Sequence, residues 1–165
     1  MSDSSRSRRP LAVFDIDNTL ADTAHRQHCL ERRPRDWKGF FRKAPADPPL
    51  DRGVALALEA AAECEVVYLT GRPEHCRADT LDWLTRHGLP EGRLFMRGNA
   101  DRRPARLTKL EALQRLARGR ELRVLVDDDE LVCQAARAAG FPVLLADWAE
   151  KAPELRLAQE GAGRT

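Results

Sequence analysis

Short apolar runs alternate with segments of helical periodicity along most of this chain. Unbroken short apolar runs are typical of parallel strands that are buried on both faces, and they occur at residues 11–14, 65–70, 93–97, 122–126 and 141–145. Between them, apolar residues recur at helical spacing over residues 51–63, 73–87, 105–118 and 131–139. This order predicts an α/β fold, with a Rossmann-like, doubly wound parallel sheet between two layers of helices.

The remaining segments are predicted to form an insert and two tails. Residues 21–50 are polar, basic and aromatic and close with several prolines, so we expect a small cap-like insert after the first strand. Residues 1–10 are basic without an apolar stretch and predict a disordered tail. Residues 151–165 end in glycine and alanine and predict a flexible tail. A single domain is therefore expected over residues 11–150.

The composition is that of an ordinary globular protein. Of the 165 residues, 42% are hydrophobic and 33% are charged, and the formal net charge is +2. Because no apolar run could span a bilayer or act as a signal peptide, we expect a cytoplasmic protein without a membrane partner. The four cysteines are scattered, which predicts reduced thiols rather than a disulfide framework or a zinc cage. Basic residues gather at 25–43 and 93–109, where they would attract an anion if these segments converge.

Three predicted strands end in polar side chains, and a lysine lies near the start of a helix; the residues are Asp15, Asp17, Thr70, Asp127, Asp128 and Lys109. Ligands of open parallel sheets bind at the carboxyl ends of the strands. Phosphoryl transfer to a carboxylate needs a nucleophile, a cation, an acid for the leaving oxygen and donors for the other oxygens. This set can supply each of them, with Asp15 as the predicted nucleophile. The plainer alternative is a polar loop that caps a following helix.

The same residues resemble the four motifs of the haloacid dehalogenase superfamily, in order: Asp15-Ile16-Asp17-Asn18-Thr19, Thr70-Gly71-Arg72, Lys109 and Asp127-Asp128. The likeness covers about residues 11–148 and implies an aspartyl-phosphate mechanism. In that mechanism Asp15 attacks phosphorus, and Asp17 protonates the leaving group and later activates water. Thr70 and Lys109 would hold phosphoryl oxygens.

The resemblance also implies a Mg²⁺ ion. Its expected ligands are Asp15, the backbone carbonyl of Asp17, and Asp128, while Asp127 either contacts the ion or supports its ligands. Family dehalogenases lack a carboxylate two residues after the nucleophile. Asp17 therefore favours a phosphatase over a dehalogenase.

Within the superfamily, the chain looks like the phosphatase domain of polynucleotide kinase-phosphatases, which removes 3′-phosphates from nucleic acid. Substrate contacts are expected from Arg26, from Gly71 and Arg72 of the second motif, and from Arg102 and Arg103 in a basic loop. One departure is Ala105, which stands where the related domain has an important acid four residues before the lysine; Asp101 is a nearby acid that could substitute. No G-x-x-x-x-G-K sequence occurs, so a P-loop kinase half is not expected. The two alternatives are a stand-alone phosphatase and one that works with a separate kinase or ligase.

Two other functions stay open from the sequence. A phosphatase for a nucleotide or another small phosphorylated metabolite would use the same chemistry, and a non-catalytic nucleic-acid-binding module could keep the fold. The aromatic residues Trp37, Phe40 and Phe41 could stack on a base or form the core of the insert. His25 and His28 have the spacing of metal ligands on a helix, but further zinc ligands are not evident apart from Cys29.

Overall fold

The computed structural model describes residues 9–162 and contains one five-stranded parallel sheet. Its strand order is β3-β2-β1-β4-β5. The strands are β1 (Leu11–Phe14), β2 (Glu65–Pro73), β3 (Arg93–Arg97), β4 (Leu122–Asp127) and β5 (Val143–Leu145). Because β1 is central and the order reverses on either side of it, the prediction of a doubly wound α/β fold is confirmed.

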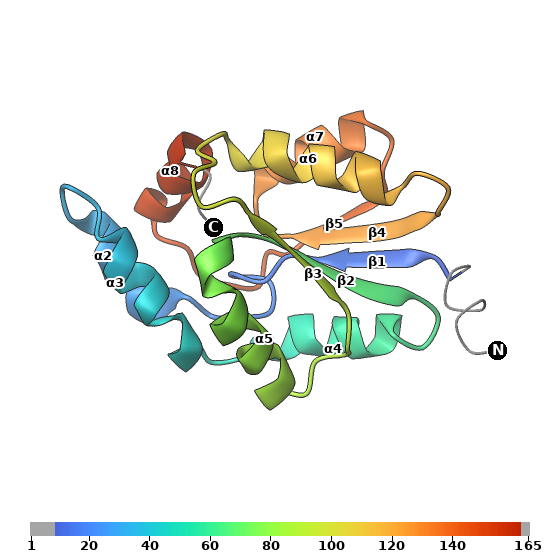
Figure 1. Ribbon diagram of the computed structural model, residues 1–165, viewed down its shortest axis with the longest axis horizontal. Helices are drawn as coiled ribbons and strands as arrows, with labels where there is room; N and C mark the ends of the chain where they lie inside the picture. Colours follow the sequence, from blue (N-terminus) through green and yellow to red (C-terminus); the bar gives the residue numbers. More distant parts are fainter. Residues whose placement is uncertain (1–8, 163–165) are drawn as a thin grey trace.

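Helices cover both faces of the sheet, which gives three layers (Figure 1). One face packs against α4 (Asp51–Ala60) and α5 (Arg77–Arg86), and the other against α6 (Ala105–Leu116) and α7 (Glu130–Ala138). Alternate residues of β1 serve the two faces: Ala12 and Phe14 join the first apolar cluster, and Leu11 and Val13 join the second. Each large apolar side chain buried in this way contributes about 1.5–3 kcal/mol to folding.

Strand β2 is longer than the predicted apolar run at residues 65–70. The strand continues to Pro73, which pairs with Arg97 of β3 after an irregularity in register. A short 3₁₀ helix, η3 (Glu74–Cys76), then leads into α5. The second motif is therefore held inside the sheet. After α5, Gly88 has φ +69°, a left-handed conformation in which glycine commonly ends a helix.

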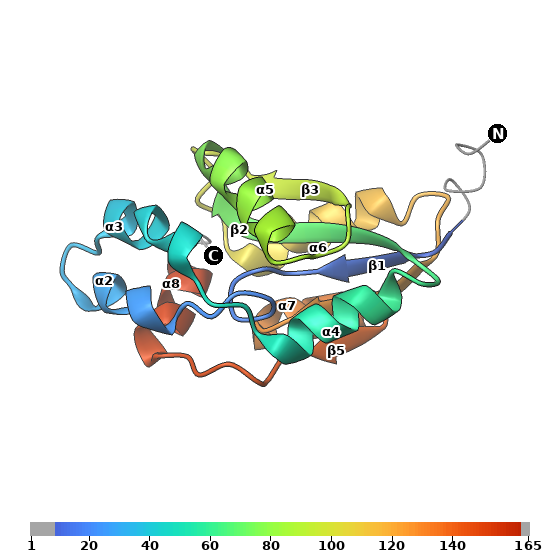
Figure 2. The ribbon, with the colours of Figure 1, turned by 90° about the horizontal axis from the view of Figure 1, so that it is seen from below.

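The insert at residues 21–50 folds into four short helical segments between β1 and α4. These are η1 (Ala24–Arg26), α2 (His28–Glu31), α3 (Trp37–Arg42) and η2 (Ala44–Ala46). The side chain of Asp36 caps α3 by accepting a hydrogen bond from the backbone N–H of Gly39. Helices α2 and α3 lie beyond one end of the sheet, on the side to which β1 points (Figures 1 and 2).

The predicted C-terminal tail is wrong for most of its length, because Pro153–Ala162 form a helix, α8. Leu155 and Ala158 of α8 are buried in an apolar cluster with Leu30, Phe40 and Phe41 of the insert. The helix also contacts α6, to which Arg106 and Glu160 contribute an ion pair. Packing against the insert and α6 thus stabilises a helix in a segment that was predicted to be a tail.

The outermost parts of the two predicted tails, residues 1–8 and 163–165, lie outside the described residues. Arg9, which we expected in the N-terminal tail, instead donates hydrogen bonds to the carbonyl oxygens of Ala61 and Ala62. Within residues 9–162, no helix is long and apolar enough to cross a membrane.

Candidate active site

The loop after β1 is tightly fixed at the carboxyl end of the sheet. The backbone N–H of Asp15 donates to the carbonyl of Val126, which continues the pairing of β1 with β4. Asn18 has φ 61°, a left-handed conformation that asparagine adopts more readily than most residues. Helix α4 approaches so closely that a methyl group on Gly53 would lie 1.9 Å from the carbonyl oxygen of Thr19. That oxygen also accepts a hydrogen bond from Trp148.

The predicted nucleophile Asp15 is held by the predicted lysine. Lys109 lies in the first turns of α6 and places its Nζ 2.9 Å from Asp15 Oδ1 and 2.7 Å from Asp127 Oδ2. The second oxygen of Asp15 faces the hydroxyl of Thr19 at 3.4 Å. The structure therefore brings residues from three distant motifs to one point. Thr19 belongs to the predicted first motif, but the sequence predicted no role for its side chain.

The carboxylates of Asp15, Asp127 and Asp128 form the candidate metal site. One oxygen from each lies within 4.8 Å of the others. Asp128 Oδ2 is 3.1 Å from Lys151 Nζ, while the buried Asp128 Oδ1 has no hydrogen-bond partner among the residues that the structure describes. Three carboxylates thus face only two ammonium groups. Oxygen ligands, a remaining negative charge and an unpartnered buried oxygen all fit Mg²⁺.

Burial dominates the protonation of this cluster. It raises the pKa of Asp15 well above its usual range, where Lys109 opposes the rise and the charge of Asp128 adds to it. It also raises the pKa of Asp127 to about 7, where the charge of Asp15 adds to the rise and Lys109 opposes it. Burial likewise raises the pKa of Asp128. For Lys109, burial acts to lower the pKa, but the charges of Asp127 and Asp15 outweigh it. A cation at this site would therefore compete with protons for the carboxylate oxygens.

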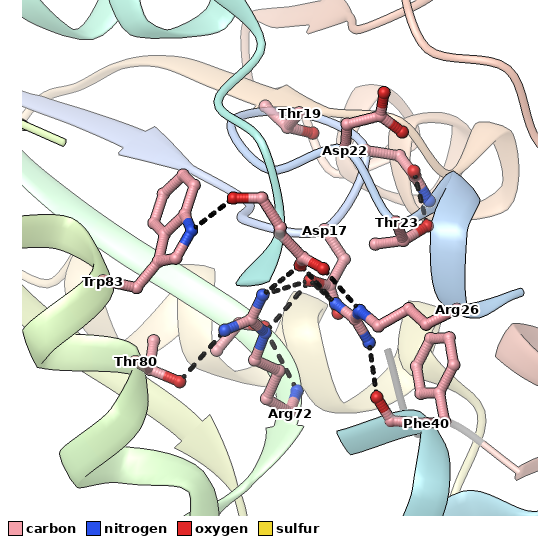
Figure 3. Close-up of polar contacts among 12 residues, drawn as sticks. Asp17, Thr19, Asp22, Thr23, Arg26, Phe40, Arg72, Thr80 and Trp83 are labelled. Carbon is pink, nitrogen blue, oxygen red and sulfur yellow. Dashed lines mark hydrogen bonds and ion pairs between the residues drawn. The ribbon is translucent and has the colours of Figure 1, made fainter. Parts of the chain in front are cut away.

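The side chain of Asp17 points toward two buried arginines, Arg26 and Arg72 (Figure 3). Its Oδ1 accepts from Arg26 Nη2 at 2.8 Å and from Arg72 Nη2 at 2.6 Å and Nε at 3.0 Å. Burial acts to raise the pKa of Asp17, but the charges of Arg72 and Arg26 outweigh it and lower the pKa to about 2. Asp17 Oδ2 is buried and has no hydrogen-bond partner within the described part of the chain. The contact of its backbone carbonyl with Mg²⁺ stays a prediction.

Sequence reasoning missed the buried acid Asp47, which completes the arginine pair. Its Oδ1 accepts from Arg26 Nε at 2.8 Å, and its Oδ2 lies 2.7 Å from Arg26 Nη2 and 3.2 Å from Arg72 Nη2. Trp83 donates to its backbone carbonyl and fixes the segment. Two carboxylates therefore balance two guanidinium groups. The only sequence signal was an aspartate before two prolines, which reads as an ordinary loop.

The remaining predicted substrate residues lie in two different environments, Thr70 and Gly71 in the buried second motif and Arg103 at the surface. The Thr70 hydroxyl accepts from the backbone N–H of Arg72, and the carbonyl of Gly71 accepts from Arg97 Nε at 3.0 Å. The exposed Arg103 pairs with Asp101 and Glu111 instead of approaching the catalytic carboxylates.

The predicted substitute for the acid missing at position 105 is Asp101, and this role stays a prediction. Its carboxylate is bound to Arg103 in an exposed loop, and Ala105 is buried in the apolar cluster beneath α6. Asp47 is instead the buried acid found beside Arg26 and Arg72.

Two of the three aromatic residues of the insert are part of its core, and one of its histidines contacts a buried acid. Phe40 and Phe41 are core residues, and the guanidinium of Arg26 lies 4.2 Å from the centre of the Phe40 ring. His25 donates to or accepts from Asp47 at 2.7 Å. Among the described residues, the only group of three or more potential metal ligands is Asp15, Asp127 and Asp128, so no zinc site is found there. The four cysteines are free and buried.

The site is enclosed. The side chains of the four motifs named above are buried, and none of Asp15, Asp17, Thr70 or Lys109 is more than 3% exposed. The insert covers one side, and the C-terminal segment covers the other through Lys151. Gln27 of the insert bonds to the backbone N–H of Ala152 and so ties the two together.

A family model confirms the resemblance that these motifs indicated. The model for the polynucleotide kinase PNKP phosphatase domain matches residues 10–149. Among curated proteins, none matches the sequence significantly.

Solved structures share the fold. A chain of the Pnkp1/Rnl/Hen1 RNA repair complex is 21% identical with a TM-score of 0.71, and the match covers 83% of this chain but only 42% of that chain. A haloacid dehalogenase-like hydrolase from Streptococcus pneumoniae is 13% identical with a TM-score of 0.64, over 93% of this chain and 91% of that one. A mutant HAD family enzyme from Bacteroides thetaiotaomicron, in complex with magnesium and inorganic phosphate, is 10% identical with a TM-score of 0.50, over 89% and 98%.

The family match begins just before β1 and extends past β5, so it includes all four motifs and the insert between the first two. The TM-scores of 0.71 and 0.64 show that the solved structures share the fold, and identities of 21% and 13% bear on the fold alone. The chain therefore belongs to the family of the polynucleotide kinase PNKP phosphatase domain and has the fold of the haloacid dehalogenase superfamily.

Proposed function

We propose that the protein is a Mg²⁺-dependent phosphomonoesterase that acts through an aspartyl-phosphate. The observation that carries this proposal is the position of Asp15, which lies at the carboxyl end of the central strand with Lys109 at 2.9 Å and two further carboxylates beside it. Membership of a phosphatase family supports it. Asp15, Asp128 and the backbone carbonyl of Asp17 would hold Mg²⁺, with Asp127 beside them, and the ion would neutralise charge on the phosphate.

The protein's own groups would carry the proton and the phosphoryl group. A carboxylate oxygen of Asp15 attacks phosphorus, so an O–P bond forms as the bond to the leaving oxygen breaks. Asp17 Oδ2, which has no partner among the described residues, gives its proton to that oxygen. A water molecule then loses a proton to Asp17, attacks the same phosphorus, and releases phosphate and free Asp15. Lys109 and Thr70 would hold the phosphoryl oxygens.

The low pKa of Asp17 determines when it gains its proton. A pKa of about 2 means that the carboxyl is ionised in the free protein at neutral pH. A phosphate that enters the site adds negative charge next to Asp17. It also interacts with Arg26 and Arg72, which then stabilise the ionised carboxyl of Asp17 less. Both effects raise the pKa. We therefore propose that Asp17 becomes protonated only when substrate is bound.

The substrate that we propose is a nucleic-acid end with a 3′-phosphate, by extension from the family. The likeness to a chain of an RNA repair complex also suggests work beside a separate ligase or kinase. The enclosed site favours a second candidate, a nucleotide or other small phosphorylated metabolite, because such a substrate needs less opening of the cover. The two candidates differ in how many phosphates the protein contacts.

A substrate panel separates them. We expect 3′-phosphorylated oligonucleotides to be hydrolysed with a higher kcat/KM than 5′-phosphorylated oligonucleotides or mononucleotides, and this preference to shrink as salt rises, because extra phosphate contacts release counterions. Activity on every substrate should fall on the order of a thousandfold or more in Asp15→Asn. Asp82→Asn, which changes an exposed aspartate on α5, is the matched control and should behave as wild type. Equal, salt-independent rates on mononucleotides would reject the nucleic-acid substrate, and an active Asp15→Asn variant would reject the mechanism.

A further inference from the structure

A cavity of 460 Å³ lies between the insert and the loops that follow β2 and β3. It contains none of the catalytic carboxylates. Helix α3 provides one wall, and η3 with the segment after β3 provides the other. This volume is within the range of sites that hold a small organic ligand. Nothing in the phosphatase chemistry proposed above uses it.

The cavity adjoins the second motif. Pro73, which lines it, directly follows Arg72 in the chain, and Cys76, which also lines it, is four residues after Arg72. Arg97 also lines it and at the same time donates to the carbonyl of Gly71, the neighbour of Thr70. A ligand in the cavity would therefore sit next to the segment that is expected to hold the phosphate.

Aromatic rings form part of the lining. Trp37 and Phe41 are stacked with centroids 5.9 Å apart and an interplanar angle of 20°, and His75 meets Phe41 edge-on at 6.1 Å. Asn99 Oδ1 accepts from the backbone N–H of His75 at 2.9 Å and lies 3.2 Å from its ring Nδ1, so the ring orientation is fixed. An oriented aromatic surface of this kind is suited to stacking on a nucleobase.

Positive charge surrounds these rings. Four cationic side chains line the cavity, against the single acid Asp79; they are Lys38, Arg42, Arg97 and Arg102. Lys38, Arg42 and Arg102 are exposed, so they can reach a ligand without leaving a buried partner. Cations beside aromatic faces are the usual arrangement for a single strand, where phosphates meet the charges and bases meet the rings.

We propose, on the basis of the phosphatase function above, that this cavity binds a nucleotide of the single strand whose terminal phosphate lies at Asp15. Its base would stack on Trp37, and its backbone phosphate would meet Arg42 and Arg102. The insert would then select polynucleotide ends, since it supplies Trp37 and Arg42. A small metabolite would leave the cavity empty. Arg102 would thus bind substrate as the family resemblance implies, but at a backbone phosphate.

Binding in the Asp15→Asn background tests this without turnover. The probe is a short oligothymidylate with a 3′-phosphate. It is titrated into the protein, and its binding is measured by tryptophan fluorescence. We expect binding to quench the fluorescence. Trp37→Leu, which keeps an apolar side chain in the insert but removes the ring, should abolish most of the quench and weaken binding about tenfold. Arg102→Ala should weaken binding and reduce the slope of log Kd against log salt by about one. Arg118→Ala, an exposed arginine after α6 and outside the cavity, is the control and should change neither.

The outcomes separate the two proposals. If wild type removes 3′-phosphates but Trp37→Leu binds as tightly as its parent with the same quench, the cavity does not hold a nucleotide and the phosphatase function stands. If the oligonucleotide quenches Trp37 but wild type releases no 3′-phosphate, the proposed function fails and the cavity remains a nucleic-acid site. Unchanged binding in Trp37→Leu and in Arg102→Ala together would overturn the inference.

Discussion

At the scale of single residues, the site consists of two charge groups that share no side chain. In the first, Asp15 and Asp127 pair with Lys109, and Asp128 pairs with Lys151. In the second, Asp17 and Asp47 pair with the guanidinium groups of Arg26 and Arg72. The first group has an excess of negative charge and the second is balanced. A buried charge whose partner is lost is costly, so each arginine depends on both of its carboxylates. Asp47 is therefore a positioning residue, because it acts on substrate only through Arg26 and Arg72.

Replacement of Asp47 by asparagine tests this role. With one carboxylate neutral, both arginines bear on Asp17 alone, which then accepts a proton less readily. We expect kcat/KM for p-nitrophenyl phosphate to fall by about a hundredfold, as for other misplaced catalytic groups, and the pH profile to move to lower pH. Breaking the buried pair should also cost about 3–5 kcal/mol of unfolding free energy.

His25→Gln is the control for Asp47, because His25 touches the same carboxylate from the solvent side, with its side chain 36% exposed. It should change kcat/KM little. If Asp47→Asn lowers the free energy of unfolding but leaves the pH profile of kcat/KM unchanged, Asp47 has only a structural role.

At the scale of elements, the insert and α8 act as one cover. Their shared apolar cluster contains Leu30, Phe40 and Phe41 from the insert and Leu155 and Ala158 from α8. The same C-terminal segment places Lys151 against Asp128. Since neither α2 nor α8 is long enough to be stable alone, each depends on this packing. Loosening one should therefore loosen the other.

Two leucines on α8 provide a matched pair for this prediction. Leu155 is fully buried, whereas Leu157 is 62% exposed. Leu155→Ala should lower the free energy of unfolding of the cover by about 2–5 kcal/mol, and Leu157→Ala should change it by less than about 0.5 kcal/mol. Hydrogen exchange should speed up in both α8 and α2 for the first variant only. Faster exchange confined to α8 would contradict a single cover.

At the scale of the whole molecule, the metal site makes stability depend on pH. Burial, with the charge of Asp15 adding to it, raises the pKa of Asp127 to about 7, while an unfolded aspartate titrates near 4. A raised folded pKa contributes stability that is complete below the unfolded pKa and is lost as pH rises through the folded one. The metal-free protein should therefore lose stability between about pH 4 and pH 7. Asp17 has the opposite sign, and its contribution is lost only as pH falls toward 2.

Mg²⁺ should restore the stability that the metal-free protein loses as the pH rises. Because the ion and the protons compete for the same oxygens, the gain in Tm on adding Mg²⁺ should be larger at about pH 8 than at about pH 6. Asp127→Asn removes the titrating group and should flatten the pH dependence of the metal-free Tm. Equal gains at both pH values in wild type would mean that these carboxylates do not exchange protons for the ion.

The sequence predicted what depends on local pattern and missed what depends on tertiary contact. The ends of β1 and β4 and the lysine of α6 were predicted because apolar runs and helical spacing mark them, and parallel strands bring their ends together. Asp47 was missed because its partners lie 21 and 25 residues away and nothing local distinguishes it. Helix α8 was missed because the glycines and alanines near the end of the chain favoured a tail, although residues 154–160 are good helix formers and Leu155 is buried. Arg103 pairs with Asp101 and Glu111 in the structure, and its contact with substrate stays a prediction.

Gly53 has a consequence for recognising other proteins of this kind. The backbone of α4 touches the carbonyl of Thr19, and even a methyl group would displace the loop that holds Asp15. The first motif therefore includes a glycine 38 positions after the nucleophile, in a helix that has no chemistry of its own. A search pattern that combines Asp-x-Asp with a glycine near the start of the first long helix should separate chains that can hold this loop from chance matches to the short motif.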